Sequence, residues 1–521
     1  MNVAEDRTVG IQGNLELFDG LIDEALACLR IGKNEQAALT ASEAVRRIPW
    51  HARARLIHGV ALARVGRLDR SVEELTVASR QSSGDAEIRY NLAVTLQQAG
   101  RIDSAMVEYA ACLAIDPCCA DALWNYGELL RIREHFAKAM ECFERLEKLE
   151  GGRRRDKMAH RMAVCCSWLA RDDEATTLFE EQIARDDEPV THWEYAHYLL
   201  ARGKFEDAWP HYARRFDAGS HIGLHRVALA YPWWTGHYES DSTLLVVGEQ
   251  GAGDEILFAA FLPDLISRAK QVGMRIVVAC RASLIRLFEA SFPCAVLVAH
   301  EVAQPADFGG IQLSPRTFQV MFGDLPQFLK KPRPAAYLSP APEDAIYMHE
   351  LLRREEGLRV GLVWSSNPFS PQANRRQRNA NTAILNAHLQ ALQHDHPDIH
   401  FFSLLDEPHR DALAQLADVR IVDMAAHLTD FSRTAALMNA LDVVVTVCTA
   451  SANLAGALGC DTRVLLQKHA DWRWCSDTAW YPNAVTYRQK VMTDWSEPIV
   501  SVCRELNHLA AATSCPALEN E

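Results

Sequence analysis

Residues 243–263 read TLLVVGEQGAGDEILFAAFLP, an apolar run followed by a glycine-rich turn and a helix-like segment. A strand, a turn and a helix in this order often bind a phosphate at the start of the helix. Here neither nucleotide motif fits, because Ile256 stands where G-x-G-x-x-G requires its third glycine and no Lys-Ser or Lys-Thr pair completes a P-loop. The turn instead carries Glu249, Asp254 and Glu255. We therefore expect it to present a base, and phosphates to bind elsewhere.

Asp254 falls at the opening of the expected helix. The helix dipole and free backbone N–H groups favour a carboxylate there, which should keep Asp254 ionised, as a general base requires. An ordinary helix-capping aspartate has the same spacing. The pattern alone therefore leaves both roles open.

Short β-branched runs continue after PWWTG, residues 232–236, with room for a helix between most of them. Strands are expected at 243–248, 275–280, 295–300, 358–366, 399–405, 419–423, 442–447 and 462–466. This alternation predicts an α/β fold with parallel sheets. The proline-rich segment 330–344 favours a boundary between two Rossmann-like lobes. We assign the lobes to residues 240–340 and 355–515, with the site in the cleft at the carboxyl ends of the strands.

Residues 1–230 follow a different period, since small residues recur every 34 positions at Ala37, Ser71, Ala105 and Ala139. Gly59, Ala93 and Gly127 occupy a matching position in the preceding helix. The period predicts tetratricopeptide-type helical hairpins, about six in number, the first partly degenerate and those near 154–187 and 192–209 looser. Stacked hairpins of this kind typically hold a peptide or protein in their concave surface. A packing scaffold or dimer surface is the alternative.

Composition narrows the class of protein. The chain has 521 residues, 49% of them hydrophobic and 23% charged, which predicts a folded protein of two or three domains. A net charge of -14 argues against a general nucleic-acid or anionic-membrane surface. Its 14 cysteines include no CxxC pair, and neither a secretory leader nor a long apolar run is found. We expect a reduced, cytoplasmic protein without a metal site.

A better anion site is VTVCTASANLAGALG, residues 445–459, where a strand ends in small and hydroxyl residues before an alanine-rich helix. Thr449 and Ser451 supply hydroxyls, Ala450 allows close backbone approach, and the helix start presents N–H groups to a diphosphate. A capped core helix is the alternative.

Two further segments carry candidate ligands. The segment SSNPFSPQANRRQR, residues 365–378, offers hydroxyls and arginines to a departing phosphate, although such arginines are often solvated loop charges. The segment DWRWCSDTAWYP, residues 471–482, offers Arg473 to a phosphate and aromatic rings to a nucleobase, with packing at the lobe interface as the alternative.

The repeats and the motifs PWWTG, GEQGAGDEILFAAFLP, GLVWSSNP, DVVVTVCTASANLAGALG and DWRWCSDTAWYP together resemble repeat-fused glycosyltransferases of the GT-B fold. The second lobe is similar to that of ADP-heptose:lipopolysaccharide heptosyltransferases. The overall plan resembles protein O-GlcNAc transferases and bacterial flagellin glycosyltransferases. The resemblance implies a tetratricopeptide solenoid followed by two Rossmann-like lobes, and inverting, metal-independent sugar transfer from a nucleotide donor without a further cofactor.

Carried over by this resemblance, the base is Asp254. The donor motif, often Asp-Thr-Ala-x-x-His in relatives, falls on residues 448–453, with Cys448 and Asn453 replacing the aspartate and the histidine. A CMP-activated nonulosonic acid brings its own carboxylate and so tolerates the loss of that aspartate, while UDP-, GDP- or ADP-sugars stay possible. The expected donor-binding residues are Gly251, Gly253, Ser365, Ser366, Asn367, Thr449, Ala450, Ser451, Asn453, Asp471 and Arg473.

The sequence thus predicts a glycosyltransferase whose repeats recruit a protein acceptor, by resemblance flagellin, and whose Asp254 activates a Ser or Thr hydroxyl. The transferred group is a hexose or a nonulosonic acid. Two alternatives stay open: a lipid- or glycan-directed transferase whose repeats oligomerise, and a catalytically decayed repeat scaffold that binds proteins only.

Overall fold

A computed structural model describes residues 3–152, 155–219, 229–300, 311, 313–329, 336–353, 356–365, 378–475 and 480–513, with side chains from residue 16 onward. The chain divides into two compact units, Met1–Asp187 and Glu188–Glu521. The sequence pattern extends the repeat domain to residue 230, whereas the contacts set the division after Asp187. The reason is that α11 (Pro189–Ala201) and α12 (Phe205–Tyr212) pack against elements of the second unit.

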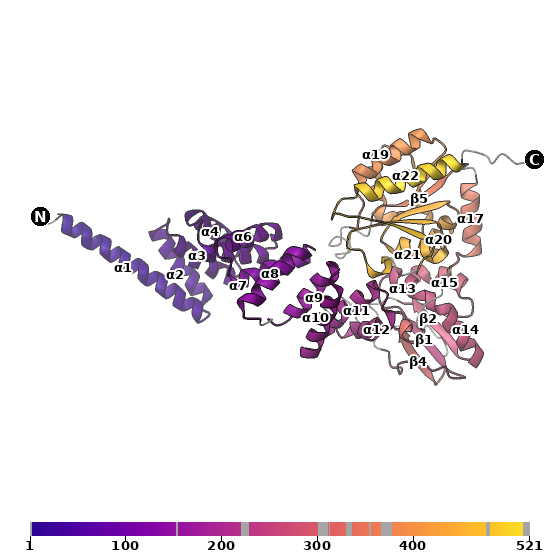
Figure 1. Cartoon of the computed structure of the whole chain (residues 1–521), viewed down its shortest axis with the longest axis horizontal. Helices are drawn as coiled ribbons and strands as arrows, with labels where there is room; N and C mark the ends of the chain where they lie inside the picture. Colours follow the sequence, from indigo (N-terminus) through magenta and orange to yellow (C-terminus); the bar gives the residue numbers. More distant parts are fainter. Residues whose placement is uncertain are drawn as a thin grey trace, which may run out of the picture. The chain divides into compact units, whose positions relative to one another are not determined.

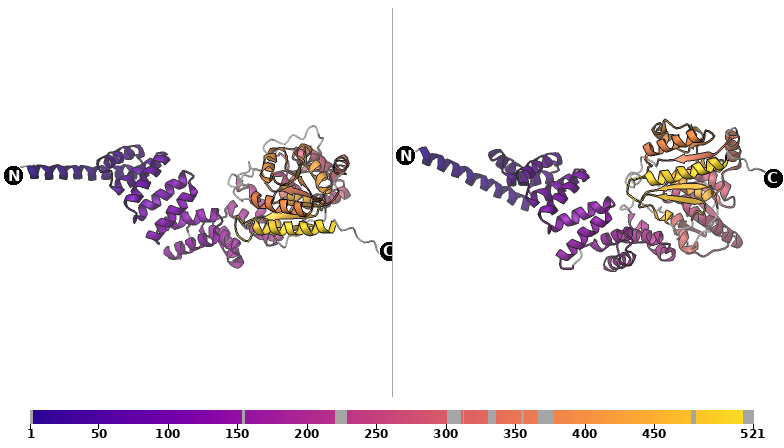
Figure 2. Two further views of the ribbon diagram at one scale, coloured as in Figure 1. Left: turned by 90° about the horizontal axis from the view of Figure 1, so that it is seen from above. Right: turned by 45° about the horizontal axis from the view of Figure 1, so that its top comes forward.

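The first unit is a series of antiparallel helix pairs (Figures 1 and 2). The pairs are α1 (Val3–Arg30) with α2 (Asn34–Arg47), α3 (Ala52–Arg64) with α4 (Leu68–Gln81), α5 (Ala86–Gln98) with α6 (Ile102–Ile115), α7 (Ala120–Ile132) with α8 (Phe136–Leu149), and α9 (Met158–Trp168) with α10 (Asp172–Arg185). The pair α11 and α12 repeats the arrangement within the second unit. The tetratricopeptide-type hairpins expected from the period are therefore present.

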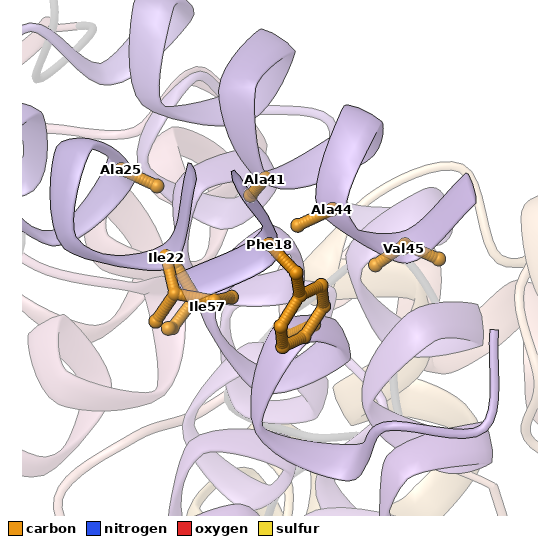
Figure 3. Close-up of a cluster of buried hydrophobic side chains, with 8 residues drawn as sticks. Phe18, Ile22, Ala25, Ala41, Ala44, Val45 and Ile57 are labelled. Carbon is orange, nitrogen blue, oxygen red and sulfur yellow. The ribbon is translucent and has the colours of Figure 1, made fainter. Parts of the chain in front are cut away.

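Small residues at the repeating positions let the two helices of a hairpin touch. A Cβ atom on Gly59 would lie 2.6 Å from Leu75 Cγ, and one on Gly127 would lie 2.8 Å from Phe143 Cε1. In the first hairpin, Phe18 and Ile22 of α1 lie against Ala41 and Ala44 of α2 in a buried cluster (Figure 3). The period seen in the sequence is thus the period of helix-to-helix contact.

The second unit contains two parallel sheets. The first has the order β3-β2-β1-β4, built from β1 (Thr243–Val247), β2 (Arg275–Cys280), β3 (Val296–Ala299) and β4 (Thr317–Met321). The second has the order β10-β9-β8-β5-β6-β7, built from β5 (Arg359–Val363), β6 (His400–Ser403), β7 (Ile421–Asp423), β8 (Val443–Val447), β9 (Thr462–Leu466) and β10 (Ala484–Arg488). The α/β class is confirmed, and all eight expected strands form.

Two edge strands, β4 and β10, are missing from the sequence-based expectation. Their sequences, TFQVM and AVTYR, mix apolar and polar residues over five positions without strict alternation, so they do not stand out as the apolar central strands do. Helices cover the sheets: α19 (Thr382–Asp395) and α22 (Ser496–Thr513) lie on one face of the second sheet, and α20 (Phe431–Asn439) and α21 (Ala450–Leu458) lie on the other (Figure 1).

The segment between the sheets ties α21 to α13 (Ala252–Phe258), the helix that follows β1. The backbone N–H groups of Tyr337 and Leu338 donate to the carbonyl of Ala457 in α21, at 3.0 Å and 3.2 Å. The Tyr337 hydroxyl donates to the carbonyl of Ile256 in α13 at 2.9 Å. One tyrosine therefore bonds to a helix from each sheet.

Glu249 is a buried anchor. Arg215 of η1 (Ala213–Phe216) is fully buried and donates through Nε and Nη2 to the two carboxylate oxygens of Glu249, at 2.9 Å and 2.6 Å. Its Nη1 also donates to Asp324 at 2.7 Å. This arrangement fixes the segment after α12 to the first sheet, so Glu249 is not a base facing solvent.

Glu255 is buried beneath the same turn, with 1% of its surface exposed. One carboxylate oxygen accepts the backbone N–H of Arg281 at 3.0 Å, and the other lies 2.6 Å from where a Cβ on Gly248 would stand. Burial raises the pKa of Glu255 to about 8. Of the three turn carboxylates, two are therefore structural.

Gly127→Ala should lower the free energy of unfolding by about 1 to 3 kcal/mol, because the added methyl group overpacks the contact with Phe143. Gly84→Ala is the matched control, since a Cβ there meets no atom within 4 Å. Urea unfolding of the full chain, followed by circular dichroism, gives the comparison. Equal stability of the two variants would show that this close approach is not a constraint.

Glu255→Gln should flatten the dependence of stability on pH. Between about pH 5 and pH 8 the folded carboxyl keeps a proton that the unfolded one has lost, so the free energy of unfolding falls as pH rises, by at most about 1.4 kcal/mol per unit. Urea unfolding at several pH values in this window should show a smaller decline for the variant than for the wild type. The exposed Glu350→Gln serves as control, and a wild-type-like slope in Glu255→Gln contradicts the assignment.

Candidate active site

Two neighbouring cavities lie within the second unit. The strand-end cavity, about 410 Å³, is lined by Ser283, Val363, Ser365, Leu404, Leu405, Asp406, His409, Leu428, Thr429, Asp430, Phe431, Thr434, Thr449, Ala450 and Ser451. The turn cavity, about 230 Å³, is lined by Trp193, His197, Gln250, Gly253, Asp254, Arg378, Cys448, Thr449, Ala450, Asn453, Asp471, Arg473 and Trp474. Both cavities share Thr449 and Ala450 at the start of α21.

The strand-end cavity lies where the order of the second sheet reverses. Successive strands run outward from β5 through β6 to β7, and the chain then returns to place β8 on the other side of β5. Residues just after β5, β6 and β8 line the cavity. Ligands of open α/β sheets bind at this kind of switch point, outside the carboxyl ends of the strands.

The start of α21 is open to a ligand. Thr449 is in extended conformation, and its hydroxyl donates to the carbonyl of Val447 at 3.3 Å rather than capping the helix. The first N–H groups of a helix have no partner within the helix itself. Those of α21 begin at Ala450, which lines both cavities.

Asp254 faces the turn cavity from the first turn of α13, with 26% of its side chain exposed. One carboxylate oxygen accepts the backbone N–H of Gly251 at 3.3 Å. The other forms an ion pair with Nη2 of Arg473. The sequence suggests either a helix-capping residue or a base at this position. The structure shows the capping contact and a carboxylate that is paired with a cation.

Arg473 comes from η8 (Trp472–Trp474), in the loop after β9. Its Nη1 donates to Asp471 at 2.7 Å, and its guanidinium lies 4.7 Å from the ring centre of Trp472. Only 12% of the side chain is exposed. Although burial disfavours the charge, Asp471 and Asp254 raise the pKa of Arg473 above its ordinary value. A single guanidinium thus joins two carboxylates.

Glycine at position 253 allows the close approach of α13 to α21. A Cβ there would lie 3.2 Å from Ala450 Cα and 3.1 Å from Asn453 Nδ2. The Asn453 side chain also accepts the Tyr481 hydroxyl at 3.2 Å. Asn453 therefore lines the turn cavity with its amide held by protein contacts.

Arg378 is a further cation at the turn cavity. Its Nη1 donates to the carbonyl of Cys448 at 3.3 Å, and within the described part of the chain no carboxylate pairs with it. The neighbouring Arg375 and Arg376 lie outside the described residues, as do Ser366 and Asn367. Sequence reasoning names Arg378 only as one of a run, because charge alone does not distinguish a cavity residue from a solvated one.

Two aromatic residues of 471–482, Trp472 and Trp480, pack against α12 and against η3 (Ala259–Phe261), the short helix that follows α13. Trp480 lies 6.3 Å from Phe205 and 6.0 Å from Phe261 between ring centres, and Trp472 lies 6.3 Å from Trp209. All five rings belong to the second unit. The packing alternative is therefore the one seen for Trp472 and Trp480, while Trp474 lines the turn cavity.

Eight of the expected donor-binding residues line the cavities, in three groups. Ser365 and Ser451 line the strand-end cavity, Gly253, Asn453, Asp471 and Arg473 line the turn cavity, and Thr449 and Ala450 line both. Gly251 lines neither cavity and instead supplies the N–H that holds Asp254. Sequence reasoning missed Asp406, although an acidic residue after the second strand of a Rossmann unit is a usable signal. It also missed Trp193 and His197, which fall in a segment assigned to the repeats.

The described residues contain no group of three or more His, Cys, Asp or Glu side chains that could hold a metal ion. Across the same residues, no helix has the length and apolar character needed to cross a membrane.

Residues 86–117 match the family described as tetratricopeptide repeat, which corresponds to α5 and α6. The chain is also similar to "Protein FlbA" of Caulobacter vibrioides, with 25% identity over 424 residues. The similarity covers 75% of this chain and 65% of the relative, so the chain spans just under two thirds of the curated relative's length.

Among solved structures, the chain resembles a tetratricopeptide repeat protein of Parabacteroides merdae, with 18% identity, coverage of 39% of this chain and 80% of that one, and a TM-score of 0.33. It also resembles pilF of Pseudomonas aeruginosa, with 19% identity, coverage of 40% and 96%, and a TM-score of 0.33. A third likeness is to YrrB, with 15% identity, coverage of 38% and 97%, and a TM-score of 0.32.

Proposed function

We propose that the protein is an inverting, metal-independent glycosyltransferase of GT-B type that moves a sugar from a nucleotide donor to a Ser or Thr hydroxyl of a protein. The observation that carries this proposal is the meeting of two cavities at the start of α21: one lies at the switch point of a parallel sheet, and the other contains Asp254. A nucleotide sugar consists of a nucleoside and a phosphate-linked sugar, and these two parts need two adjoining sites.

The strand-end cavity suits the nucleoside. Its volume of about 410 Å³ is in the range of small-molecule sites. Hydroxyl groups of Ser365, Thr429 and Thr434 line it together with Asp406, which follows β6. In Rossmann units an acidic residue at this position commonly accepts hydrogen bonds from the ribose, so we assign Asp406 to the ribose hydroxyls.

The phosphates then fall at the start of α21. Open backbone N–H groups and the helix dipole favour an anion there. Arg378 and Arg473 line the adjoining cavity. One arginine guanidinium can donate two parallel hydrogen bonds to two oxygens of a phosphate or a carboxylate. Cys448 leaves this cavity without the carboxylate that the family motif would supply, which supports a donor with its own carboxylate, such as a CMP-nonulosonic acid, over UDP-, GDP- or ADP-sugars.

The chemical step follows from the position of Asp254. Its carboxylate takes the proton of the acceptor hydroxyl, whose oxygen attacks the anomeric carbon from the side opposite the nucleotide. The bond from that carbon to the phosphate oxygen breaks, and its electron pair leaves with the phosphate, whose charge is met by α21 and the arginines. Attack from the opposite face inverts the anomeric configuration.

The acceptor is proposed to be a protein because tetratricopeptide hairpins commonly present a concave surface to peptides. Flagellin is the favoured acceptor by resemblance alone. A lipid- or glycan-directed transferase predicts sugar transfer to a lipid extract instead. A decayed scaffold predicts no binding of any nucleotide sugar, which calorimetry with CMP-, UDP-, GDP- and ADP-sugars tests directly.

Asp254→Ala should abolish glycan transfer, because removing a general base typically costs about a hundredfold to ten-thousandfold in rate. A deletion strain is complemented with the wild type, with Asp254→Ala or with Asp442→Asn, and its proteins are compared by intact mass. Asp442 pairs with Arg359 at the amino ends of β8 and β5, whereas the cavities lie at the carboxyl ends. Asp442→Asn therefore removes a similar ion pair away from the cavities.

The expected result is loss of the glycan mass in the deletion strain and in Asp254→Ala, with restoration by Asp442→Asn. Full restoration by Asp254→Ala, from protein present at the wild-type level, would remove Asp254 from the mechanism.

A further inference from the structure

We propose that Arg473 moves from Asp254 to the donor's phosphate when the donor binds. Donor binding itself then releases Asp254 to act as the base. This inference rests on the proposed function and deepens it. The observation behind it is one guanidinium held between two carboxylates in the cavity that adjoins the open start of α21.

Both oxygens of the Asp254 carboxylate have protein partners. One is paired with Arg473, and the other accepts the N–H of Gly251. An acceptor hydroxyl that arrives first therefore meets a carboxylate whose oxygens are both engaged.

Arg473 can leave Asp254 without leaving the cavity. Its two terminal nitrogens have different partners, Nη1 with Asp471 and Nη2 with Asp254. The Trp472 ring and Asp471, which is 8% exposed, hold the guanidinium from the side of its own loop. The pairing with Asp254, by contrast, joins η8 to helix α13, which follows a strand of the other sheet, so a rotation of one side chain suffices to break it.

A phosphate is the ligand that can draw Arg473 away. In the resting turn cavity the charges of Asp254 and Asp471 offset those of Arg473 and Arg378. A phosphate bound at Ala450 adds negative charge beside this balanced set. Arginine pairs strongly with phosphate oxygens, and the new bond offsets the loss of the partly exposed contact with Asp254. The freed oxygen of Asp254 then faces the space where the acceptor hydroxyl must lie.

The exchange predicts opposite effects on nucleotide binding when the two partners of the ion pair are removed. If the phosphate must take Arg473 from Asp254, then removing the carboxylate should make nucleotide binding tighter. Asp254→Asn should abolish transfer and yet bind the nucleotide more strongly. Arg473→Gln should weaken nucleotide binding, because the phosphate loses its cation.

The test is calorimetric titration of the full-length protein with CMP, CDP, UDP, GDP and ADP. For whichever nucleotide the wild type binds, Asp254→Asn should lower Kd by roughly threefold to tenfold, the size of one partly exposed ion pair. Arg473→Gln should raise it by roughly tenfold or more. Asp442→Asn, which opens the distant pair with Arg359, should leave it unchanged. Asp254→Ala provides a second variant, and thermal unfolding verifies that each protein is folded.

An unchanged or raised Kd in both Asp254 variants, with binding by the wild type intact, overturns the exchange and leaves the proposed function standing. Absence of binding by the wild type to every nucleotide overturns both. A lowered Kd in both variants, with Arg473→Gln weakened, supports the exchange.

Discussion

The candidate site depends on how closely two helices approach one another at Gly253. A side chain as small as a methyl group at that position would press on Ala450 and Asn453 at the start of α21. Because α13 begins just after β1 of one sheet and α21 just after β8 of the other, this contact brings the carboxyl ends of two sheets together. It puts the Asp254 carboxylate, the open end of α21 and the Arg473 guanidinium around one cavity.

The three carboxylates of the turn have different roles because their surroundings differ. Glu249 is held by two nitrogens of the buried Arg215 and so fixes the segment after α12 to the first sheet. Glu255 lies under Gly248 and is largely desolvated, which raises its pKa to about 8. Asp254 alone lines a cavity. The acidic turn is thus mainly a way of holding one carboxylate in place, which explains why the turn carries more charge than a phosphate-binding loop would.

The sequence predicts the structure where only one kind of residue can fill a given structural position. The 34-residue recurrence of small residues identified the hairpins because only such residues allow contacts like that of Gly127 with Phe143. Apolar runs identified the central strands. Edge strands such as β4 escaped notice because their mixed composition resembles that of a loop. The pairing of Asp254 with Arg473 could not be predicted either, since 219 positions separate the two residues and only the approach of the lobes joins them.

A crystal structure of the full-length protein with the nucleotide that it binds tests the central claim most directly. The account predicts phosphate oxygens on the backbone N–H groups at the start of α21, Arg473 turned from Asp254 to the phosphate, and a carboxylate oxygen of Asp254 exposed to the acceptor side of the cavity. A nucleotide seated away from α21, or a bound nucleotide with Arg473 still paired to Asp254, would contradict it.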